Sequence, residues 1–262
     1  MKKKSLLILI ISLCFTTCKK EENENLCYSN TLISQVNSGD LAVHGLTYNS
    51  NCLIYESTEP FIYKKFSYDA QNMLNKVEVA YSLNPFSCVM IPGQSLESDP
   101  RKASVSEYSE FKYDDDLRLT KKLNYFINNG NPQLTSYQTY DYENDKIVKL
   151  STFNPQELLI QYHDYKYDDN VNITRDDQYI NSPAIKLVNT TTYEFDNKNN
   201  PYLVFACEGN PGKYTNRNNI ITETSVSYYG TSESHNTRVN VYEYNTLGYP
   251  VKINMLDCRY GQ

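Results

Sequence analysis

Side chains able to carry out acid–base or metal chemistry are few in this sequence, and they are scattered. The three histidines are His44, His163 and His235, and no two of them stand at a metal-ligand spacing. No nucleophile-elbow, zincin or phosphate-loop motif occurs either. We therefore predict no catalytic residue, no metal site and no cofactor, and we interpret each histidine as structural or exposed.

Acidic runs at 114–116, 168–169 and 176–177 are the other candidates, because oxygen-rich turns can bind calcium. None of them has EF-hand spacing, and the first two are explained by the turns of a repeat. A carboxylate pair for glycoside hydrolysis can lie far apart in sequence. A hydrolase is therefore the weakest of three functional alternatives.

Seven cysteines are present, and two of them, Cys14 and Cys18, fall within the first eighteen residues. Five remain, so one thiol is left over when two bridges form. We expect the disulfides Cys27–Cys52 and Cys207–Cys258, one at each end of the repeats, although the sequence leaves the pairing open. No two cysteines have the CxxC spacing of a zinc or thioredoxin-type site.

The first residues, MKKKSLLILIISLCFTTC, have the composition of an export signal: a basic start, then a short apolar run. A transmembrane helix would need about 20 apolar residues, more than this run contains. The segment resembles the lipobox of bacterial lipoproteins, with Cys18 as the lipidated residue. The resemblance implies a signal peptide over 1–17 and a lipidated Cys18. The polar residues that follow predict a flexible linker, so we assign 18–26 to the lipidated cysteine and linker, and the length of the remainder suits a single β-repeat domain over 27–262. The resemblance also implies an anchor in the outer membrane, and the charged residues after Cys18 resemble a signal for surface exposure.

Composition narrows the class of partner. The formal net charge is −6 even with three lysines at the start of the chain, so nucleic acid is not expected as a partner. Tyrosine is the outlier, with 25 tyrosines, 9 phenylalanines and no tryptophan. Tyrosine favours strands, and its hydroxyl can stay hydrated while the ring is buried.

One phrase recurs through the body of the chain: an aromatic, a polar spacer, a second aromatic and then an acidic or amide residue. Its copies are Phe66-Ser67-Tyr68-Asp69, Phe111-Lys112-Tyr113-Asp114, Tyr140-Asp141-Tyr142-Glu143, Tyr165-Lys166-Tyr167-Asp168, Tyr193-Glu194-Phe195-Asp196 and Tyr242-Glu243-Tyr244-Asn245. A degenerate copy, Leu46-Thr47-Tyr48-Asn49, precedes them. Aromatics two positions apart share one face of a strand, and an Asp or Asn starts a turn. Each copy therefore predicts a β-hairpin.

The phrase is similar to the YD repeat of the Rhs and YD-repeat families, over roughly residues 60–256. Those families build sheets from successive hairpins. We expect an all-β fold, an antiparallel meander of repeated hairpins forming a twisted, curled or half-closed sheet. The two long gaps between copies, near 85–102 and 207–219, are expected to be loop insertions. The bridges and the N-terminal segment are expected to protect the edge strands.

Three functions remain open. The first is a non-enzymatic, lipid-anchored envelope protein whose Tyr-rich sheet scaffolds or binds a protein partner. The second is a surface glycan-binding accessory of a nutrient-uptake system, which predicts exposed tyrosines outside the repeat register, such as Tyr179, Tyr228 and Tyr229. The third is the hydrolase, which needs converging carboxylates or a Ser–His pair.

Overall fold

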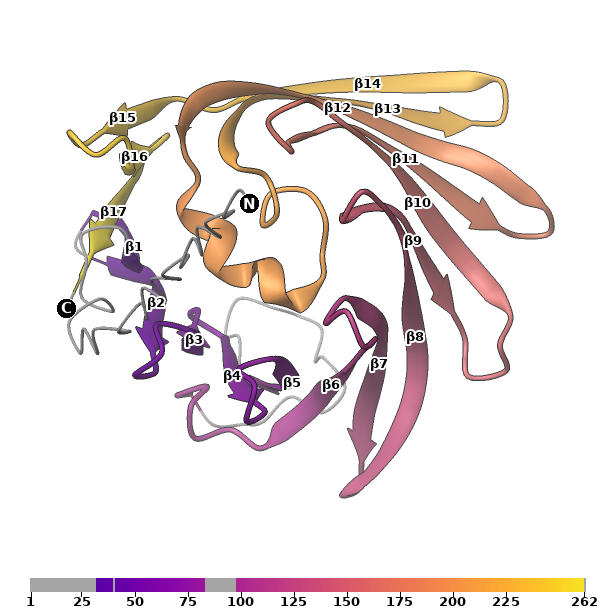
Figure 1. Cartoon of the computed structure of the whole chain (residues 1–262), viewed down its shortest axis with the longest axis horizontal. Coiled ribbons are helices and arrows are strands. Elements are labelled where there is room, and N and C mark those ends of the chain that lie inside the picture. Colours follow the sequence, from indigo (N-terminus) through magenta and orange to yellow (C-terminus); the bar gives the residue numbers. More distant parts are fainter. Residues whose placement is uncertain (1–31, 40, 83–97, 262) are drawn as a thin grey trace, which may run out of the picture.

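The computed structural model describes residues 32–39, 41–82 and 98–261, and β-strands dominate it (Figure 1). The described strands are β1 (Ile33–Ser38), β2 (Leu41–Tyr48), β3 (Ile54–Thr58), β4 (Ile62–Tyr68), β5 (Leu74–Tyr81), β6 (Val105–Tyr113), β7 (Leu119–Asn128), β8 (Asn131–Glu143), β9 (Lys146–Phe153), β10 (Leu159–Tyr167), β11 (Ile173–Asn181), β12 (Ile185–Asn199), β13 (Asn218–Tyr229), β14 (Ser232–Val239), β15 (Tyr242–Tyr244), β16 (Pro250–Ile253) and β17 (Leu256–Tyr260). A 3-10 helix, η2 (Pro201–Glu208), separates β12 from β13. No helix in the described part of the chain has both the length and the hydropathy to span a bilayer.

All seventeen strands form one antiparallel sheet that curls round on itself (Figure 1). Each strand from β1 to β13 pairs with the next one in the chain, and β15, β16 and β17 pair in the same way. The last strand, β17, also pairs with β1, so the two ends of the described chain lie side by side. No register joins β14 to β15 within the described ranges, so the sheet stays unclosed. The expected half-closed meander of hairpins is confirmed.

The turn of each repeat is built as the sequence predicts. The Asp69 carboxylate accepts hydrogen bonds from the backbone N–H groups of Gln71 and Met73, at 2.8 and 2.9 Å. The same pair of bonds forms at the turn residues of three other copies, Asn49, Asp114 and Asn245, and also at Asn154 between β9 and β10. Asp168 makes one such bond, to Asn172. These side chains replace backbone partners in the turn, which explains why Asp and Asn recur there.

Two copies of the repeat depart from this turn. After Glu143 the chain reverses through Asn144 and Asp145, whose φ angles of 47° and 62° are those of a two-residue hairpin turn. Asp196 accepts from Lys198 N and also from Asn219 N, across the insertion between β12 and β13. The turn residue Asp196 therefore binds the chain both just before and just after the insertion.

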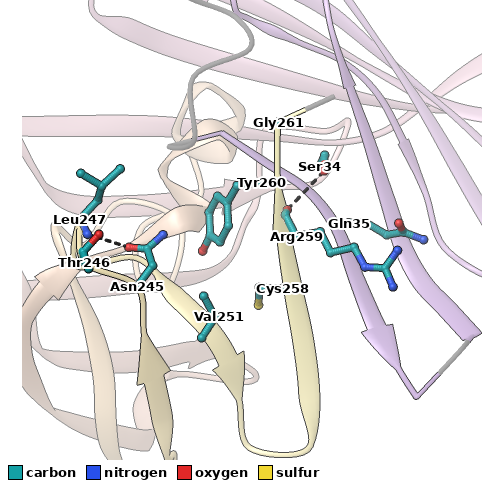
Figure 2. Close-up of a pocket in the computed structure, with 10 residues that line it drawn as sticks. All are labelled: Ser34, Gln35, Asn245, Thr246, Leu247, Val251, Cys258, Arg259, Tyr260 and Gly261. Atoms are coloured by element: carbon teal, nitrogen blue, oxygen red, sulfur yellow. Dashed lines mark hydrogen bonds between the residues drawn. The ribbon is translucent and has the colours of Figure 1, made fainter.

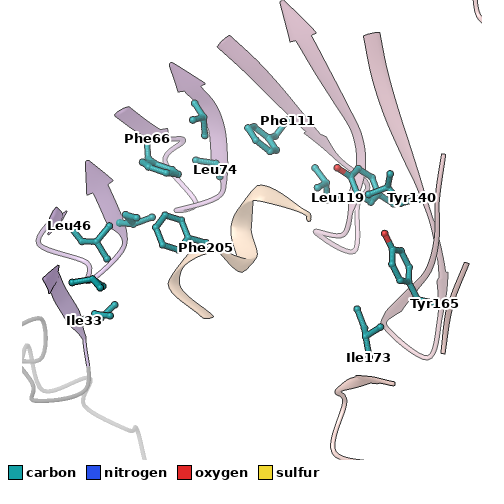
Figure 3. Packing of buried hydrophobic residues seen from close by; sticks show 14 of the residues in the cluster. Ile33, Leu46, Phe66, Leu74, Phe111, Leu119, Tyr140, Tyr165, Ile173 and Phe205 are labelled. Atoms are coloured by element: carbon teal, nitrogen blue, oxygen red, sulfur yellow. The ribbon is translucent and has the colours of Figure 1, made fainter. Parts of the chain in front are cut away.

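That insertion is more ordered than the predicted loop. Asn200 caps η2 by accepting from Tyr202 N at 3.0 Å, and Pro201 occupies the first turn, where its missing N–H costs nothing. The helix lies inside the curl of the sheet (Figures 1 and 3), and we call residues 200–217 the plug. Phe205, 3 % exposed, packs its ring 6.3 Å from that of Phe66.

The first aromatic of each central repeat faces the plug. Phe66, Phe111, Tyr140 and Tyr165 all belong to one buried cluster, together with Phe205 (Figure 3). They are joined by apolar residues that begin the second strand of a hairpin: Ile54, Leu74, Leu119 and Ile173. The inner face of the sheet thus carries the aromatic core, as predicted.

The predicted disulfide Cys207–Cys258 is wrong, because both cysteines are free thiols. Folding of the plug places Cys207 beside Tyr68 on β4, whereas Cys258 lies on β17 opposite Val36 of β1. Cys52 is disulfide-bonded, but Cys27, its predicted partner, lies outside the described residues. The edges are also protected differently from the expectation, since β1 and β17 pair with each other.

Candidate binding surface

The second aromatic of each repeat ties one hairpin to the one before it. Its hydroxyl donates to a backbone carbonyl at or next to the start of an earlier strand. These bonds are Tyr48 to Ile33, Tyr68 to Ile54, Tyr113 to Leu74, Tyr142 to Leu119 and Tyr167 to Ile147, at 2.6–2.9 Å. We call this series the tyrosine ladder. Burial raises the pKa of these hydroxyls, which therefore remain protonated donors.

The ladder changes in the last two repeats. Phe195 has no hydroxyl to donate, and the plug supplies contacts there instead: Asn216 accepts from Ile173 N at 2.7 Å. In the final repeat the first aromatic, Tyr242, donates to Ile220 O at 2.9 Å, and the second, Tyr244, donates to Asp196. The repeat residues predicted from sequence therefore have structural roles.

The plug is held by charge as well as by packing. Lys64 Nζ lies 3.2 Å from the Glu208 carboxylate, and Lys122 Nζ donates to Glu208 O at 3.4 Å. Burial lowers the pKa of Lys122. Glu208 is itself buried, and a buried charge requires a partner, which Lys64 provides here. This cluster holds the plug in place and leaves no open acid–base pair.

A Ser–His pair is present, but it is buried beneath the plug. His44 Nε2 is 2.7 Å from Ser57 Oγ, and Ser57 is 3 % exposed. The ring of His44 stacks on Phe205 at 5.8 Å. Burial first, and then Lys213 and Lys64, lower the pKa of His44 to about 4. Among the described residues, no carboxylate bonds to the ring to orient it, and the buried Ser57 hydroxyl is not accessible to a substrate.

The remaining candidates for chemistry are engaged elsewhere. His163 Nδ1 is 2.8 Å from Asp176, and its ring stacks on Tyr165. Asp114 and Asp116 pair with Arg118 at 3.0 and 3.3 Å. Over the described ranges, no group of three or more His, Cys, Asp or Glu side chains is placed to hold a metal ion.

A cavity of about 650 Å³ lies where the two ends of the described chain meet (Figure 2). Its lining includes Arg259, Ser34 and the thiol of Cys258. Burial raises the pKa of that thiol to about 11, so it is a protonated, unreactive group. Nothing in this cavity pairs an acid with a base.

Beyond the turns and the plug, the outer face of the sheet carries three stacked pairs of aromatic rings. They are Tyr108–Tyr125, Tyr137–Phe153 and Tyr162–Tyr179, with ring centroids 4.6, 5.1 and 4.6 Å apart. Each pair has a lysine ammonium over its first ring: Lys76, Lys121 and Lys149, at 4.5, 3.9 and 3.9 Å. We call these six rings the outer aromatic band, which crosses β6 to β11.

The band faces away from the core because its residues have the opposite parity from the inward aromatics. Tyr108 is three positions before Phe111 on β6, and side chains alternate between faces along a strand. Tyr125 and Tyr137 belong to adjacent strands, and Tyr137 is opposite Leu123, two positions from Tyr125. Diagonal neighbours at this spacing are about 7–8 Å apart, so the pairs form a staggered row.

The inner face of strands β6 to β13 carries many polar side chains where the plug does not reach, together with apolar ones such as Phe126 and Ile180. Ten of the polar side chains are hydroxyls, amides or an imidazole: Ser109, Asn124, Ser136, Gln138, Thr152, Gln161, His163, Gln178, Asn189 and Ser227. We call these ten residues the inner polar face. The hydrogen bonds of the plug reach none of them in the described part of the chain.

Sequence reasoning missed both of these surfaces, except for Tyr179. The signal was present, because Ser109 stands two positions before Phe111 and must share its face. Of the other two tyrosines expected to be exposed, Tyr229 is 69 % exposed, whereas Tyr228 lies within hydrogen-bonding reach of Thr190. Cys18 and the segments 1–17 and 18–26 lie outside the described residues.

No family model matches this chain, and no curated protein does. A porin-like protein from Bacteroides vulgatus is 14 % identical with a TM-score of 0.53, over 88 % of this chain and 99 % of that one. A porin-like protein from Bacteroides uniformis is 14 % identical with a TM-score of 0.46, over 84 % and 88 %. The TcdB2-TccC3 toxin structure is 12 % identical with a TM-score of 0.29, over 76 % of this chain and 10 % of that one. The first of these proteins shares the fold, and the other two likenesses are too low to carry an argument.

Proposed function

We propose that this chain is a lipid-anchored protein of the outer membrane that binds a protein partner without catalysing a reaction. The observation that carries the proposal is the outer aromatic band. Its rings are half-buried and stacked, and they have no part in the core or the tyrosine ladder. Aromatic rings of this kind are enriched in protein interfaces, where they supply large contact areas.

The proposal of a lipid anchor rests on the sequence around Cys18. We also propose, from the sequence, that the body of the chain is built from YD-type repeats. The name of the porin-like Bacteroides vulgatus protein, whose fold is similar, agrees with a place in the envelope. Replacing Cys18 by Ser is expected to move the protein from the membrane fraction to the soluble fraction of cells. A variant that stays in the membrane fraction contradicts lipid anchoring.

The binding role is tested by photo-crosslinking in living cells, from a photoreactive amino acid placed at Lys121 of the full chain. A discrete adduct is expected, and it should disappear when Tyr108, Tyr137 and Tyr162 are all replaced by Ser. The matched control replaces Ser109, Gln138 and His163 by Ala. These residues follow the three tyrosines directly but face inward, so the adduct should survive. An adduct lost in both variants, or in neither, contradicts the proposal.

A glycan-binding accessory is the second candidate, because one specific observation favours it. Hydroxyl and amide groups dominate the inner polar face, and these are the groups that hydrogen-bond to sugars. A hydrolase remains the weakest alternative. The Ser–His pair that it requires is covered by Phe205.

A further inference from the structure

We propose that the inner polar face holds a binding groove for an uncharged oligosaccharide, between β5 and β8. This inference deepens the glycan-binding candidate above and does not depend on whether the outer aromatic band binds a protein. The groove has a volume of about 510 Å³, within the roughly 300–1,000 Å³ typical of small-molecule sites. Its lining includes Ser109, Asn124, Phe126 and Ser136 from the inner face, and also Tyr108 and Tyr125 of the outer aromatic band.

The polar groups of the groove form a relay with unused capacity. Ser109 Oγ donates to Asn124 Oδ1 at 2.8 Å, and Asn124 Nδ2 donates to Ser136 Oγ at 3.1 Å. An amide nitrogen has two N–H groups and each hydroxyl can both donate and accept, so every member keeps a free position. Both strand registers place the three side chains on the inner face, where Ser109 and Ser136 are opposite Asn124. A sugar, whose hydroxyls both donate and accept, matches such a set.

Polar groups continue from the groove along the sheet. Gln178 Nε2 donates to Gln161 Oε1 at 3.3 Å, which leaves the carbonyl of one amide and the NH₂ of the other available. Between Gln138 and Gln161 lies Thr152, whose buried hydroxyl has no partner among the described residues. An unpaired buried hydroxyl in a native fold calls for an explanation, and an ordered water between the sheet and the groove supplies one.

The charged side chains near the groove favour an uncharged ligand. Glu107 is the carboxylate among the described residues that line the groove, and it already accepts from Tyr81 at 3.2 Å. Lys122 is on the same face, but it is buried and bonded to the plug. An anionic chain would therefore find no available cation here. Phe126 lines the groove with no ring stacked on it in the described ranges, so its face can pack against the C–H face of a sugar ring.

The test is titration calorimetry of the full chain in detergent micelles with maltohexaose, cellohexaose and xylohexaose. We expect saturable binding of at least one of them, weakened at least 10-fold by Asn124→Leu. The matched control is Tyr137→Ser, because this residue of β8 faces outward and does not line the groove. It should leave the Kd unchanged while weakening any protein contact of the outer band.

A second variant protects the test against a folding defect. Ser109→Ala with Ser136→Ala removes both hydroxyls of the relay with little change in volume, and it should also weaken binding while the circular dichroism spectrum stays unchanged. No binding of any of the three sugars overturns this inference, and so does equal weakening by Asn124→Leu and Tyr137→Ser. In either case the crosslinking result at Lys121 still decides the protein-binding proposal separately.

Discussion

The same strands build two regions that differ in what covers them. We call the region that contains the repeat turns and the plug the turn half, and the region that contains the inner polar face and the outer aromatic band the open half. In the turn half, the repeat aromatics pack against the plug, and the tyrosine ladder and the ion pair of Lys64 with Glu208 bind polar groups there. In the open half, the inner polar face and the outer aromatic band are half-buried and uncovered by the plug. Because the repeat residues stabilise the fold, the surfaces available for binding are the inner polar face and the outer aromatic band, which lie outside the repeat motifs.

Removing the anchor of the plug should damage the turn half most. Phe205→Ala is expected to reduce the free energy of unfolding by about 3–5 kcal/mol, the usual cost of a large buried aromatic. Urea unfolding followed by circular dichroism measures this loss. Leu203, 41 % exposed on the same helix, provides the control, and its replacement by Ala should change stability by less than about 0.5 kcal/mol. Equal losses at the two positions contradict the assigned position of the plug.

Acid should also weaken the turn half. The pKa of His44 is lowered to about 4, so between its unfolded value of about 6.5 and pH 4 the unfolded chain binds the extra proton. Stability is therefore complete above pH 6.5 and falls by up to about 3 kcal/mol as the pH drops to 4. Urea midpoints measured across this range should show the fall. His44→Asn should flatten that part of the profile, and an unchanged slope contradicts the assignment.

Removing one rung of the tyrosine ladder should have a smaller effect. Tyr113→Phe leaves the Leu74 carbonyl without its donor at a residue that is 1 % exposed, and we expect a loss of about 1–2 kcal/mol. Tyr125→Phe, in the outer aromatic band, removes a hydroxyl for which the structure shows no hydrogen bond. It should change the urea midpoint very little. A Tyr113→Phe variant as stable as the wild type means that the ladder does not stabilise the fold.

A substitution in the turns should stabilise the protein. Val171 has a φ of 67°, a left-handed conformation that a β-branched residue adopts only under strain. Val171→Gly is expected to raise the free energy of unfolding by about 1 kcal/mol. The equivalent position of another repeat, Asn72 at 63°, provides the comparison, since Asn tolerates this conformation. Asn72→Gly should therefore gain less in the same thermal melt.

The open half should tolerate substitution. Gln178→Ala removes one hydrogen bond from a half-buried surface position, so we expect a change within about 0.5 kcal/mol in urea unfolding. A loss comparable to that of Phe205→Ala would erase the distinction between the two halves. The open half would then be part of the core.

Local rules explain which features could be predicted from sequence. The spacing of Phe111 and Tyr113 predicted that both side chains lie on one face of a strand, and Asp114 predicted the turn that follows. Both predictions depend only on residues close together in the chain. The capping signals of η2, Asn200 and Pro201, were also present. Their position inside the sheet was not predictable, because it depends on contacts such as that of Phe205 with Phe66, which are remote in sequence.

The errors have the same origin. Cys207 and Cys258 flank the end of the repeats, but the plug carries Cys207 to β4, and no local pattern encodes that path. The inner polar face follows from the parity of Ser109 and Phe111. Whether that face is covered depends on how far the plug extends, which is again a property of the assembled fold.

The pairing of β1 with β17 has a consequence for the order of assembly. More than two hundred residues separate these two strands, so Val36 cannot meet Cys258 until β17 has been made. Hairpins such as β6–β7 can form as soon as their own residues are available, whereas this pairing requires closure of a much longer loop. Strand β1 therefore has β2 as its partner during synthesis and gains β17 only after that strand has been made. A truncation of only the final strand would expose an edge at the opposite end of the sequence.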